Sequence, residues 1–300
     1  MDLDLDADQS ALQDAVAKAL ARHGTDTGVL AELEAAGFLD VVRDGGPIEG
    51  VLVVEKAAEA KLDAPVAARV LVGPLAGVTD LPAAVGLVDG LTGSLCRWAP
   101  LCQAFLVLDG EQVVLADRAE VEVVAVSSAF GMGYGRVSVH GGRVVGAAAP
   151  LRRAWRTAIA AEAGATMLAA VARTTEHVTQ RHQFGRPIGS FQAVQHRLAT
   201  AYSMAVGTQW LARRAAWAVD DDFLTAAAAA YACEAAQLTY TNCHQVSGAI
   251  GVTTEFGLVG WTTRLLGLRQ ELGGQRAHAA AVVTARRALP KLWPSPLPLP

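Results

Sequence analysis

Residues 181–192 read RHQFGRPIGSFQ, and they interrupt a long helical pattern. Apolar residues at helical spacing predict one helix over about 151–181 and another over about 190–219, with Gly185-Arg186-Pro187 between them. Three more helical patterns follow, at about 223–246, 258–270 and 275–289. Long antiparallel helices joined by short links predict a helical bundle in the C-terminal half.

The side chains of this link suit an anion beside an aromatic base. The link offers two guanidinium groups, two Gln amides and the ring of Phe184, and we expect Ser190 to cap the following helix. Guanidinium groups and a helix N-terminus both attract phosphate. From the residues alone, a pyrophosphate-binding segment and an ordinary helix–helix link with exposed arginines are equally good interpretations.

The chain changes character between about 83 and 148. Short segments rich in Val predict strands at about 83–88, 104–108, 113–116, 121–126, 136–140 and 143–147. Asp89-Gly90, Asp109-Gly110 and Gly141-Gly142 predict turns, so we expect a small antiparallel sheet with at least two hairpins. A strand, not a helix, follows Gly131-x-Gly133-x-Gly135, which favours a flexible turn over a phosphate loop.

The N-terminal region has the pattern of short helices. Leu12, Val16 and Leu20 form one apolar stripe, a second helix capped by Thr27 ends at Gly37, and a third pattern covers about 48–62. Gly73-Pro74 is expected to close this region. We therefore expect a mostly α chain with four parts: a helical region at 1–80, a β-rich middle domain at 81–149, a helical bundle at 150–289 and a Pro-rich tail at 290–300.

Composition narrows the class of protein. Hydrophobic residues make up 52% of the 300 residues and charged residues 18%, which excludes a disordered chain. No apolar run has the character of a membrane-spanning helix, and the first residues lack the regions of a secretory signal. The four cysteines have no metal-finger spacing, so we expect buried free thiols, no metal site and a cytoplasmic location.

The net charge of −4 conceals an asymmetry. Residues 1–150 hold 10 Lys/Arg against 21 Asp/Glu, whereas residues 151–300 hold 15 against 8. Fourteen of those 15 cations are Arg, whose planar fork suits phosphate and carboxylate. The second half either handles phosphates, docks on an acidic surface or presents an ordinary solvated face. No basic run interleaves with aromatic residues, so nucleic acid is not an expected partner.

Two motifs together resemble the acyl-CoA dehydrogenase family. The first is the link at 181–192, and the second is His244-Gln245-Val246-Ser247-Gly248-Ala249-Ile250-Gly251, followed by Glu255. The order of helical start, β-rich middle and four-helix C-terminal bundle also matches. The resemblance is close over 151–275 and loose over 1–150. It implies an acyl-CoA dehydrogenase-like fold.

The resemblance implies FAD as the cofactor, bound between subunits, with both motifs reaching toward a neighbour's flavin. Arg181 and Gln183 would bind the pyrophosphate, and Phe184 would contact the adenosine end. The second motif, where Ala249 replaces a glycine typical of the family, would line the path of the ADP moiety. The implied cofactor-binding residues are Arg181, Gln183, Phe184, Gln192, Gln245, Gly248 and Gly251.

The family's catalytic base is a glutamate that takes the α-proton of an acyl thioester, and burial raises the pKa of such a carboxyl toward the working range. Its early position falls near Trp155, which cannot serve. Its late position falls at or within one residue of Glu271, for which an exposed loop residue is the alternative. Glu162 is a further carboxylate, for which a structural pair with an Arg is the alternative. Arg156 resembles an arginine near the family's acyl-CoA site, or belongs to a solvated helix start.

This chain departs from the family where the flavin ring would lie. It is shorter than most members, and its middle region lacks their Thr-Glu…Gly-Ser-Asp loop that covers the ring. Cys96-Arg97-Trp98-Ala99-Pro100 leads into the sheet instead. A chain without that loop is expected to hold the ring poorly by itself, while still lending its ADP-binding half to a partner's flavin.

Three functions follow from these features. The resemblance implies a subunit of a FAD-dependent acyl-CoA dehydrogenase, which desaturates an acyl-CoA such as a steroid side-chain CoA ester and passes electrons to an acceptor protein. The alternative is a non-catalytic partner that completes the FAD site of a full-length homologue, most simply in an α2β2 assembly, with the base in the partner chain. This second pattern is similar to the short subunits of actinobacterial heteromeric acyl-CoA dehydrogenases. A helical scaffold without cofactor is the third hypothesis.

Overall fold

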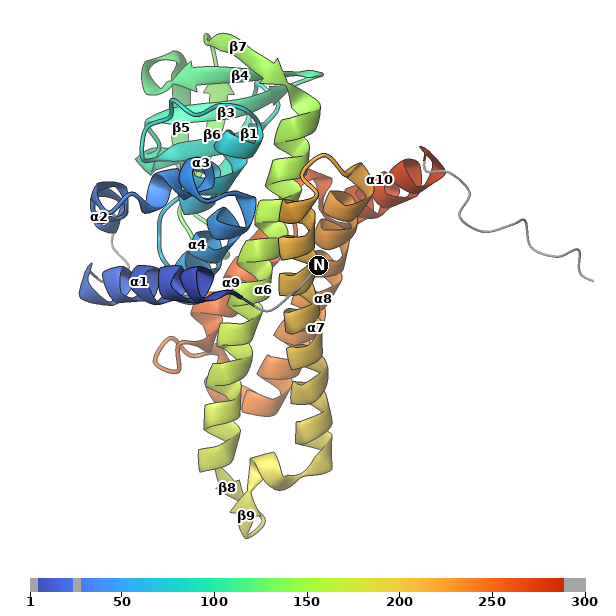
Figure 1. The fold of residues 1–300 in the computed structure, drawn as a ribbon. Helices are drawn as coiled ribbons and strands as arrows, with labels where there is room; N and C mark the ends of the chain where they lie inside the picture. The colour runs from blue at the N-terminus through green and yellow to red at the C-terminus, as the bar shows by residue number, and fades with distance from the viewer. Residues whose placement is uncertain (1–4, 24–27, 289–300) are drawn as a thin grey trace, which may run out of the picture.

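The computed structural model describes residues 5–23 and 28–288. Its central element is the helix α6 (Ala148–Gln180), which runs along the molecule from the β-sheets to a small hairpin at the opposite end (Figure 1). The N-terminal helices and the sheets lie on one side of the first half of α6, and the other bundle helices lie along it. The expected mostly α fold with a β-rich middle is confirmed. Thr27 and the Pro-rich tail lie outside the described residues.

The N-terminal region consists of short helices, as expected. They are α1 (Ala7–His23), α2 (Val29–Ala35), α3 (Val41–Asp44), α4 (Pro47–Glu59) and α5 (Gly73–Leu75), with a π-helical turn at Ala68–Val72 before α5. Gly37 ends the α2 segment with a left-handed φ of 78°. Gly73 and Pro74 begin α5, the last helix of the region, which ends one residue later at Leu75, so the region closes where expected. Gly73 packs closely there, since a Cβ atom would lie 2.3 Å from the side chain of Leu81.

The middle of the chain forms two sheets. The strands are β1 (Val85–Asp89), β2 (Ser94–Arg97), β3 (Ala104–Asp109), β4 (Gln112–Asp117), β5 (Val121–Val126), β6 (Tyr134–Val139) and β7 (Arg143–Ala147). One sheet has the order β1-β3-β4-β7 and the other β2-β6-β5. All pairings are antiparallel except β1 with β3, which is parallel.

Two details of the sheet expectation are wrong. The strands divide between two sheets instead of forming one, and β1 pairs with β3 in parallel instead of antiparallel. The expectation of at least two hairpins is confirmed, by β3 with β4 across Asp109-Gly110 and by β5 with β6. Gly141-Gly142 leads from one sheet to the other, and strand β2 was not predicted. The segment that contains Gly131 and Gly133 is a turn before β6, as expected, and Gly135 lies inside β6.

The bundle contains the helices predicted by the apolar spacing. After α6 come α7 (Gln192–Trp217), α8 (Asp222–Ser247), α9 (Leu258–Leu268) and α10 (Gly274–Ala288). Fully buried alanines on α6, α7 and α8 let these helices approach closely. Asp221 caps α8 by accepting a hydrogen bond from the Leu224 amide. A buried ion pair between Glu55 of α4 and Arg213 of α7 (2.8 Å) joins the bundle to the N-terminal helices.

Other expectations concern single features of the chain. The four cysteines are free and buried, as predicted. Among residues 5–23 and 28–288, no helix combines the length and the apolar character needed to cross a membrane. The same residues contain no group of three or more His, Cys, Asp or Glu side chains suited to a metal ion.

Candidate functional site

A cavity of about 500 Å³ lies where the sheets, the N-terminal region and the bundle meet. Its walls are mainly apolar and include Ala68, Leu87, Trp98, Phe130 and Leu272. Its polar groups come from distant parts of the chain, including β2, α6 and the link between α9 and α10. A largely apolar cavity with a few convergent polar groups is the usual form of a ligand site.

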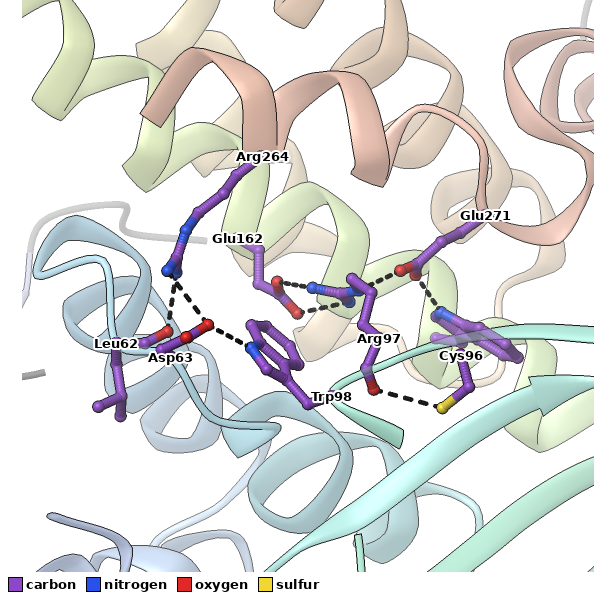
Figure 2. Close-up of polar contacts among 9 residues, drawn as sticks. Leu62, Asp63, Cys96, Arg97, Trp98, Glu162, Arg264 and Glu271 are labelled. Atoms are coloured by element: carbon purple, nitrogen blue, oxygen red, sulfur yellow. Dashed lines mark hydrogen bonds and ion pairs between the residues drawn. The ribbon is translucent and has the colours of Figure 1, made fainter. Parts of the chain in front are cut away.

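Arg97, the last residue of β2, is the central charged group of this cavity. Its Nη1 lies 2.6 Å from Oε2 of Glu162, its Nη2 lies 3.2 Å from Oε1 of the same carboxylate, and its Nε is paired with Glu271 (Figure 2). All three side chains are largely buried. Burial by itself lowers the pKa of Arg97. The two carboxylates raise this pKa by more than burial lowers it, so the net shift is upward and the guanidinium stays charged.

Glu271 opens the short 3-10 turn Glu271–Gly273 between α9 and α10. Its side chain is only 13% exposed, so the alternative of an exposed loop residue is wrong. One oxygen pairs with Arg97, and the other accepts a 2.5 Å hydrogen bond from the indole N–H of Trp155. Burial raises the pKa of Glu271 above its usual range, and Arg97 opposes this shift. Both carboxylate oxygens are therefore occupied by side chains of this chain.

Glu162 has the structural role that the sequence analysis offered as its alternative, since it forms a two-point pair with an arginine. The identity of that arginine could not be deduced, because Arg97 lies 65 residues earlier on a strand that the Val-rich pattern did not reveal. The available signal was a single cation within an otherwise apolar stretch, Leu95 to Leu101.

A second series of polar contacts joins the N-terminal region, the sheets and the bundle. The Trp98 indole donates a 2.6 Å hydrogen bond to Asp63, which also lies 3.5 Å from Nη2 of Arg264 (Figure 2). Arg264 of α9 donates a further 2.8 Å bond to the carbonyl oxygen of Leu62. Trp98 adopts a left-handed φ of 53°, which directs the chain from β2 into the 3-10 turn Ala99–Leu101. Arg97 and Trp98 are thus held firmly against the bundle.

The first motif forms an exposed hairpin at the far end of α6. The two-residue strands β8 (His182–Gln183) and β9 (Arg186–Pro187) pair across Phe184 and Gly185. Phe184 has a φ of 53°, and its ring is 91% exposed. Arg181 and Gln183 are also exposed, and within the described part of the chain neither side chain has an ion pair or a hydrogen bond. The hairpin therefore presents an aromatic ring and free donors to its surroundings.

The cap expected from Ser190 is wrong. The Ser190 hydroxyl donates a 2.7 Å hydrogen bond to the Pro187 carbonyl oxygen, and the residue before α7 is Phe191, which has no side-chain cap. Phe191 packs under the guanidinium of Arg186 at 4.1 Å from the ring centroid. The first helical residue is Gln192, an exposed side chain at the N-terminus of α7. The exposed end of α7 therefore leaves its first amides without a side-chain partner.

The second motif lies at the end of α8 and in the 3-10 turn Gly248–Val252. His244 is structural, because its Nε2 lies 2.8 Å from the Thr262 hydroxyl of α9. Gly248 has a φ of 63°, and no atom lies within 4 Å of where a Cβ would stand. Gly251 is buried, and a Cβ there would lie 2.9 Å from Cβ of Ser247. Gln245 is exposed beside this turn.

The candidate cofactor-binding residues and the candidate base Glu271 lie in different parts of the structure. The seven candidate cofactor-binding residues do not line the cavity that contains Glu271. Arg156 does not line it either: it is half-buried on α6, where burial lowers its pKa and nearby Asp222 opposes the shift. The structure thus brings Glu271 together with Trp155, Glu162 and Arg97, but not with Arg156.

Comparison with known proteins bears on the fold and on the family resemblance. Residues 153–287 match the model of the acyl-CoA dehydrogenase C-terminal domain family. Acyl-CoA dehydrogenase FadE34 of Mycobacterium tuberculosis is 33% identical over 144 residues, which cover 44% of this chain and 20% of that protein. Acyl-CoA dehydrogenase IpdE2 of Mycolicibacterium smegmatis is 33% identical over 103 residues, covering 34% of this chain and 33% of that protein. The chain thus matches a third or less of the length of these relatives.

Solved structures extend the similarity of fold to nearly the whole chain. A chain of the ChsE4-ChsE5 complex from Mycobacterium tuberculosis superposes with a TM-score of 0.79 over 97% of this chain and 100% of that chain, at 22% identity. A chain of the Tcur3481-Tcur3483 steroid ACAD G363A variant gives a TM-score of 0.78 over 94% and 98%, at 19% identity.

The fold is therefore that of the acyl-CoA dehydrogenases. Residues 153–287 of the bundle match the acyl-CoA dehydrogenase C-terminal domain, which confirms the resemblance drawn from residues 181–192 and 244–251.

Proposed function

We propose that this chain is a subunit of a FAD-dependent acyl-CoA dehydrogenase assembly and completes the flavin site of a full-length homologue. The assembly would desaturate an acyl-CoA between its α and β carbons. A steroid side-chain CoA ester is the substrate that we favour, because the structural relatives include a steroid enzyme of paired chains. The proposal includes a cytoplasmic location, an α2β2 arrangement and a separate electron-acceptor protein.

The observation that carries the proposal is the pairing of Arg97 with Glu162 and Glu271. A general base must bring a carboxylate oxygen within reach of the proton it removes and must be basic enough to take it. In Glu271 one oxygen is bound by a guanidinium and the other by the Trp155 indole. The charge of Arg97 also stabilises the ionised carboxylate and weakens it as a base. The base of the reaction would then come from the partner chain.

The residues of the exposed hairpin and of the turn at Gly248 fit the part of a flavin site that holds the ADP end of FAD. Arg181 and Gln183 have exposed donors suited to a pyrophosphate, and the exposed ring of Phe184 suits an adenine. Gln192 stands at an uncapped helix N-terminus, which favours a bound anion. Gln245 and the open turn at Gly248 leave room for the ADP moiety to pass.

The part of a flavin site that holds the flavin ring does not fit the residues of this chain. Arg97 and Trp98 occupy the corner between β2 and the bundle, and each is fixed by a short hydrogen bond to a carboxylate. A flavin ring in this corner would have to displace the buried guanidinium and leave two carboxylates without their cation. When bound in a partner, FAD supplies the oxidant that accepts a hydride from the substrate. The residues of this chain would bind and orient its ADP end.

The test is co-expression of the full chain with a full-length acyl-CoA dehydrogenase homologue from the same genome. We expect one flavin per pair of unlike chains, seen as visible flavin absorbance, and acyl-CoA-dependent reduction of an acceptor dye only in the pair. Full flavin occupancy and dehydrogenase activity in a preparation of this chain alone would contradict the proposal.

A second candidate function is a dehydrogenase that uses Glu271 of this chain as its base. It is favoured by the burial of Glu271, which raises its pKa, and by its place at the family's late base position. Arg97 would then have to leave Glu271 when substrate binds. Retained activity in an assembly that carries Glu271→Gln in this chain would exclude this candidate.

A further inference from the structure

Lys61 is a partly exposed lysine that has no acidic partner. It follows the end of α4 and adopts a left-handed φ of 57°. Its Nζ lies 3.9 Å from the ring centroid of Trp261 on α9. Within the part of the chain that the structure describes, this amine forms no ion pair and no hydrogen bond. The acidic residues nearest in sequence, Glu59 and Asp63, pair with other cations.

The groups around this amine are positive. A Cβ on Gly257 would lie 3.9 Å from Nζ, which places the amine at the N-terminus of α9. This helix has no side-chain cap, and the first amides of a helix carry partial positive charge. Arg264 of α9 donates a 2.8 Å hydrogen bond to the carbonyl oxygen of Leu62, the residue after the lysine. Arg173 of α6 adds a second full positive charge near the amine.

These surroundings disfavour the charged form of the amine. Partial burial, followed by Arg264 and Arg173, lowers the pKa of Lys61 below its ordinary value. The face of Trp261 favours the cation and opposes this shift, and it also holds the side chain in place. Near neutral pH a larger fraction of this amine is neutral than in an ordinary lysine. The neutral amine is the nucleophilic form, and desolvation and a neighbouring cation are the usual means of activating a lysine.

We propose that Lys61 is a modification site that takes an acyl group from acyl thioesters such as acyl-CoA. The neutral amine attacks the carbonyl carbon of the thioester, a C–N amide bond forms and the C–S bond breaks. The thiol leaves as a thiolate and takes up the proton that the nitrogen releases. The amide product is uncharged, so the repulsion from Arg264 and Arg173 is removed. This reaction goes beyond the proposed function and needs neither flavin nor a partner chain, so either proposal can fail without the other.

Two other lysines of the chain provide internal controls. Lys18 is exposed on α1, and Lys56 of α4 forms a 2.8 Å ion pair with Glu59. The full chain would be incubated with acetyl-CoA at about pH 8, and acetylation at each lysine followed over time by peptide mass spectrometry. We expect Lys61 to be acetylated at least about threefold faster than Lys18 or Lys56, because more of its amine is neutral. Equal or slower acetylation of Lys61 would overturn the proposal.

Two further measurements separate the effect of the positive surroundings from simple access to the amine. The preference for Lys61 should shrink as pH rises from about 8 to about 10, because ordinary lysines then lose their protons as well. Arg173→Gln should slow acetylation of Lys61 at about pH 8, because it removes a neighbouring cation. Arg136→Gln, at an exposed arginine of β6, is the control and should leave the rate unchanged. A preference that is the same at both pH values, together with an unchanged rate in Arg173→Gln, would show that access alone selects the lysine and would contradict the proposal.

Discussion

The indole nitrogen of Trp155 donates a 2.5 Å hydrogen bond to the carboxylate of Glu271, which lies 116 residues later in the chain. The family resemblance placed a catalytic glutamate either near Trp155 or at or within one residue of Glu271. The fold brings both positions to one wall of the cavity. A glutamate at either position would therefore reach the same space, and in this chain only Glu271 is present to do so. Arg97 binds that glutamate from the sheet side.

Replacing Glu271 by Gln in the assembled pair should leave most of the dehydrogenase activity and all of the flavin in place. The reason is that Arg97 occupies the carboxylate, so Glu271 is not a free base. Steady-state rates with an acceptor dye and the visible flavin absorbance measure both quantities. The matched change at the partner's catalytic glutamate should abolish turnover. Loss of turnover on Glu271→Gln with flavin still bound would show that the base is in this chain.

Arg97→Met should destabilise the fold by about 3–5 kcal/mol at neutral pH, because two buried carboxylates lose the cation between them. Urea unfolding followed by circular dichroism measures this loss. Adding Glu162→Gln and Glu271→Gln to Arg97→Met should recover much of the stability. Arg287→Met, at an exposed position of α10, serves as the control and should change little. A small effect of Arg97→Met would show that water reaches these carboxylates freely.

Glu271 makes the stability depend on pH in a defined direction. Burial raises its pKa above the ordinary value of 4.5, so the folded state holds this proton more tightly than the unfolded state does. The contribution of Glu271 to stability is therefore present at acid pH and is lost as pH rises above about 4.5 and through the raised pKa. Relative to the wild type, Glu271→Gln should become steadily more stable over that window. The unfolding free energies of the wild type and of Glu271→Gln would be measured from acid to neutral pH. Two curves that stay parallel over this range would contradict the expectation.

Arg181→Ala should weaken FAD retention by the assembled pair about 10- to 100-fold, since one charge-assisted bond contributes about 1.5–3 kcal/mol. Arg276→Ala is the control, because Arg276 is an exposed arginine of α10 away from both motifs. Flavin content after dialysis and the dissociation constant of added FAD compare the two variants. Equal flavin retention in the two variants would remove Arg181 from the cofactor site.

Arg213→Met should destabilise the chain by about 3–5 kcal/mol at neutral pH, because it leaves the buried carboxylate of Glu55 unpaired. Burial already raises the pKa of Glu55, and the loss of Arg213 would raise it further. The defect should therefore shrink as pH falls and Glu55 takes up a proton. Thermal unfolding at several pH values tests this, with Arg286→Met on the exposed face of α10 as the control. A defect that does not change with pH would indicate lost packing as its cause.

Local patterns in the chain were enough to predict the order of the elements. The five bundle helices and the strands β5 and β7 follow from periodicities of 3.6 and 2 residues, which are local properties of the chain. The motif at 181–192 likewise identified the family because its residues lie together in the sequence. Strand β2 escaped prediction, since it is only four residues long and ends in Arg97.

Which residues meet depends on contacts between distant parts of the fold. The division into two sheets, the parallel pairing of β1 with β3 and the use of Ser190 within its own loop all depend on contacts that periodicity does not encode. The same holds for the site, where Arg97 reaches Glu162 across 65 residues and Trp155 reaches Glu271 across 116. A charged side chain carries no local sign of its partner. The partner is fixed when packing removes water from both groups, because burial then makes any unpaired arrangement costly.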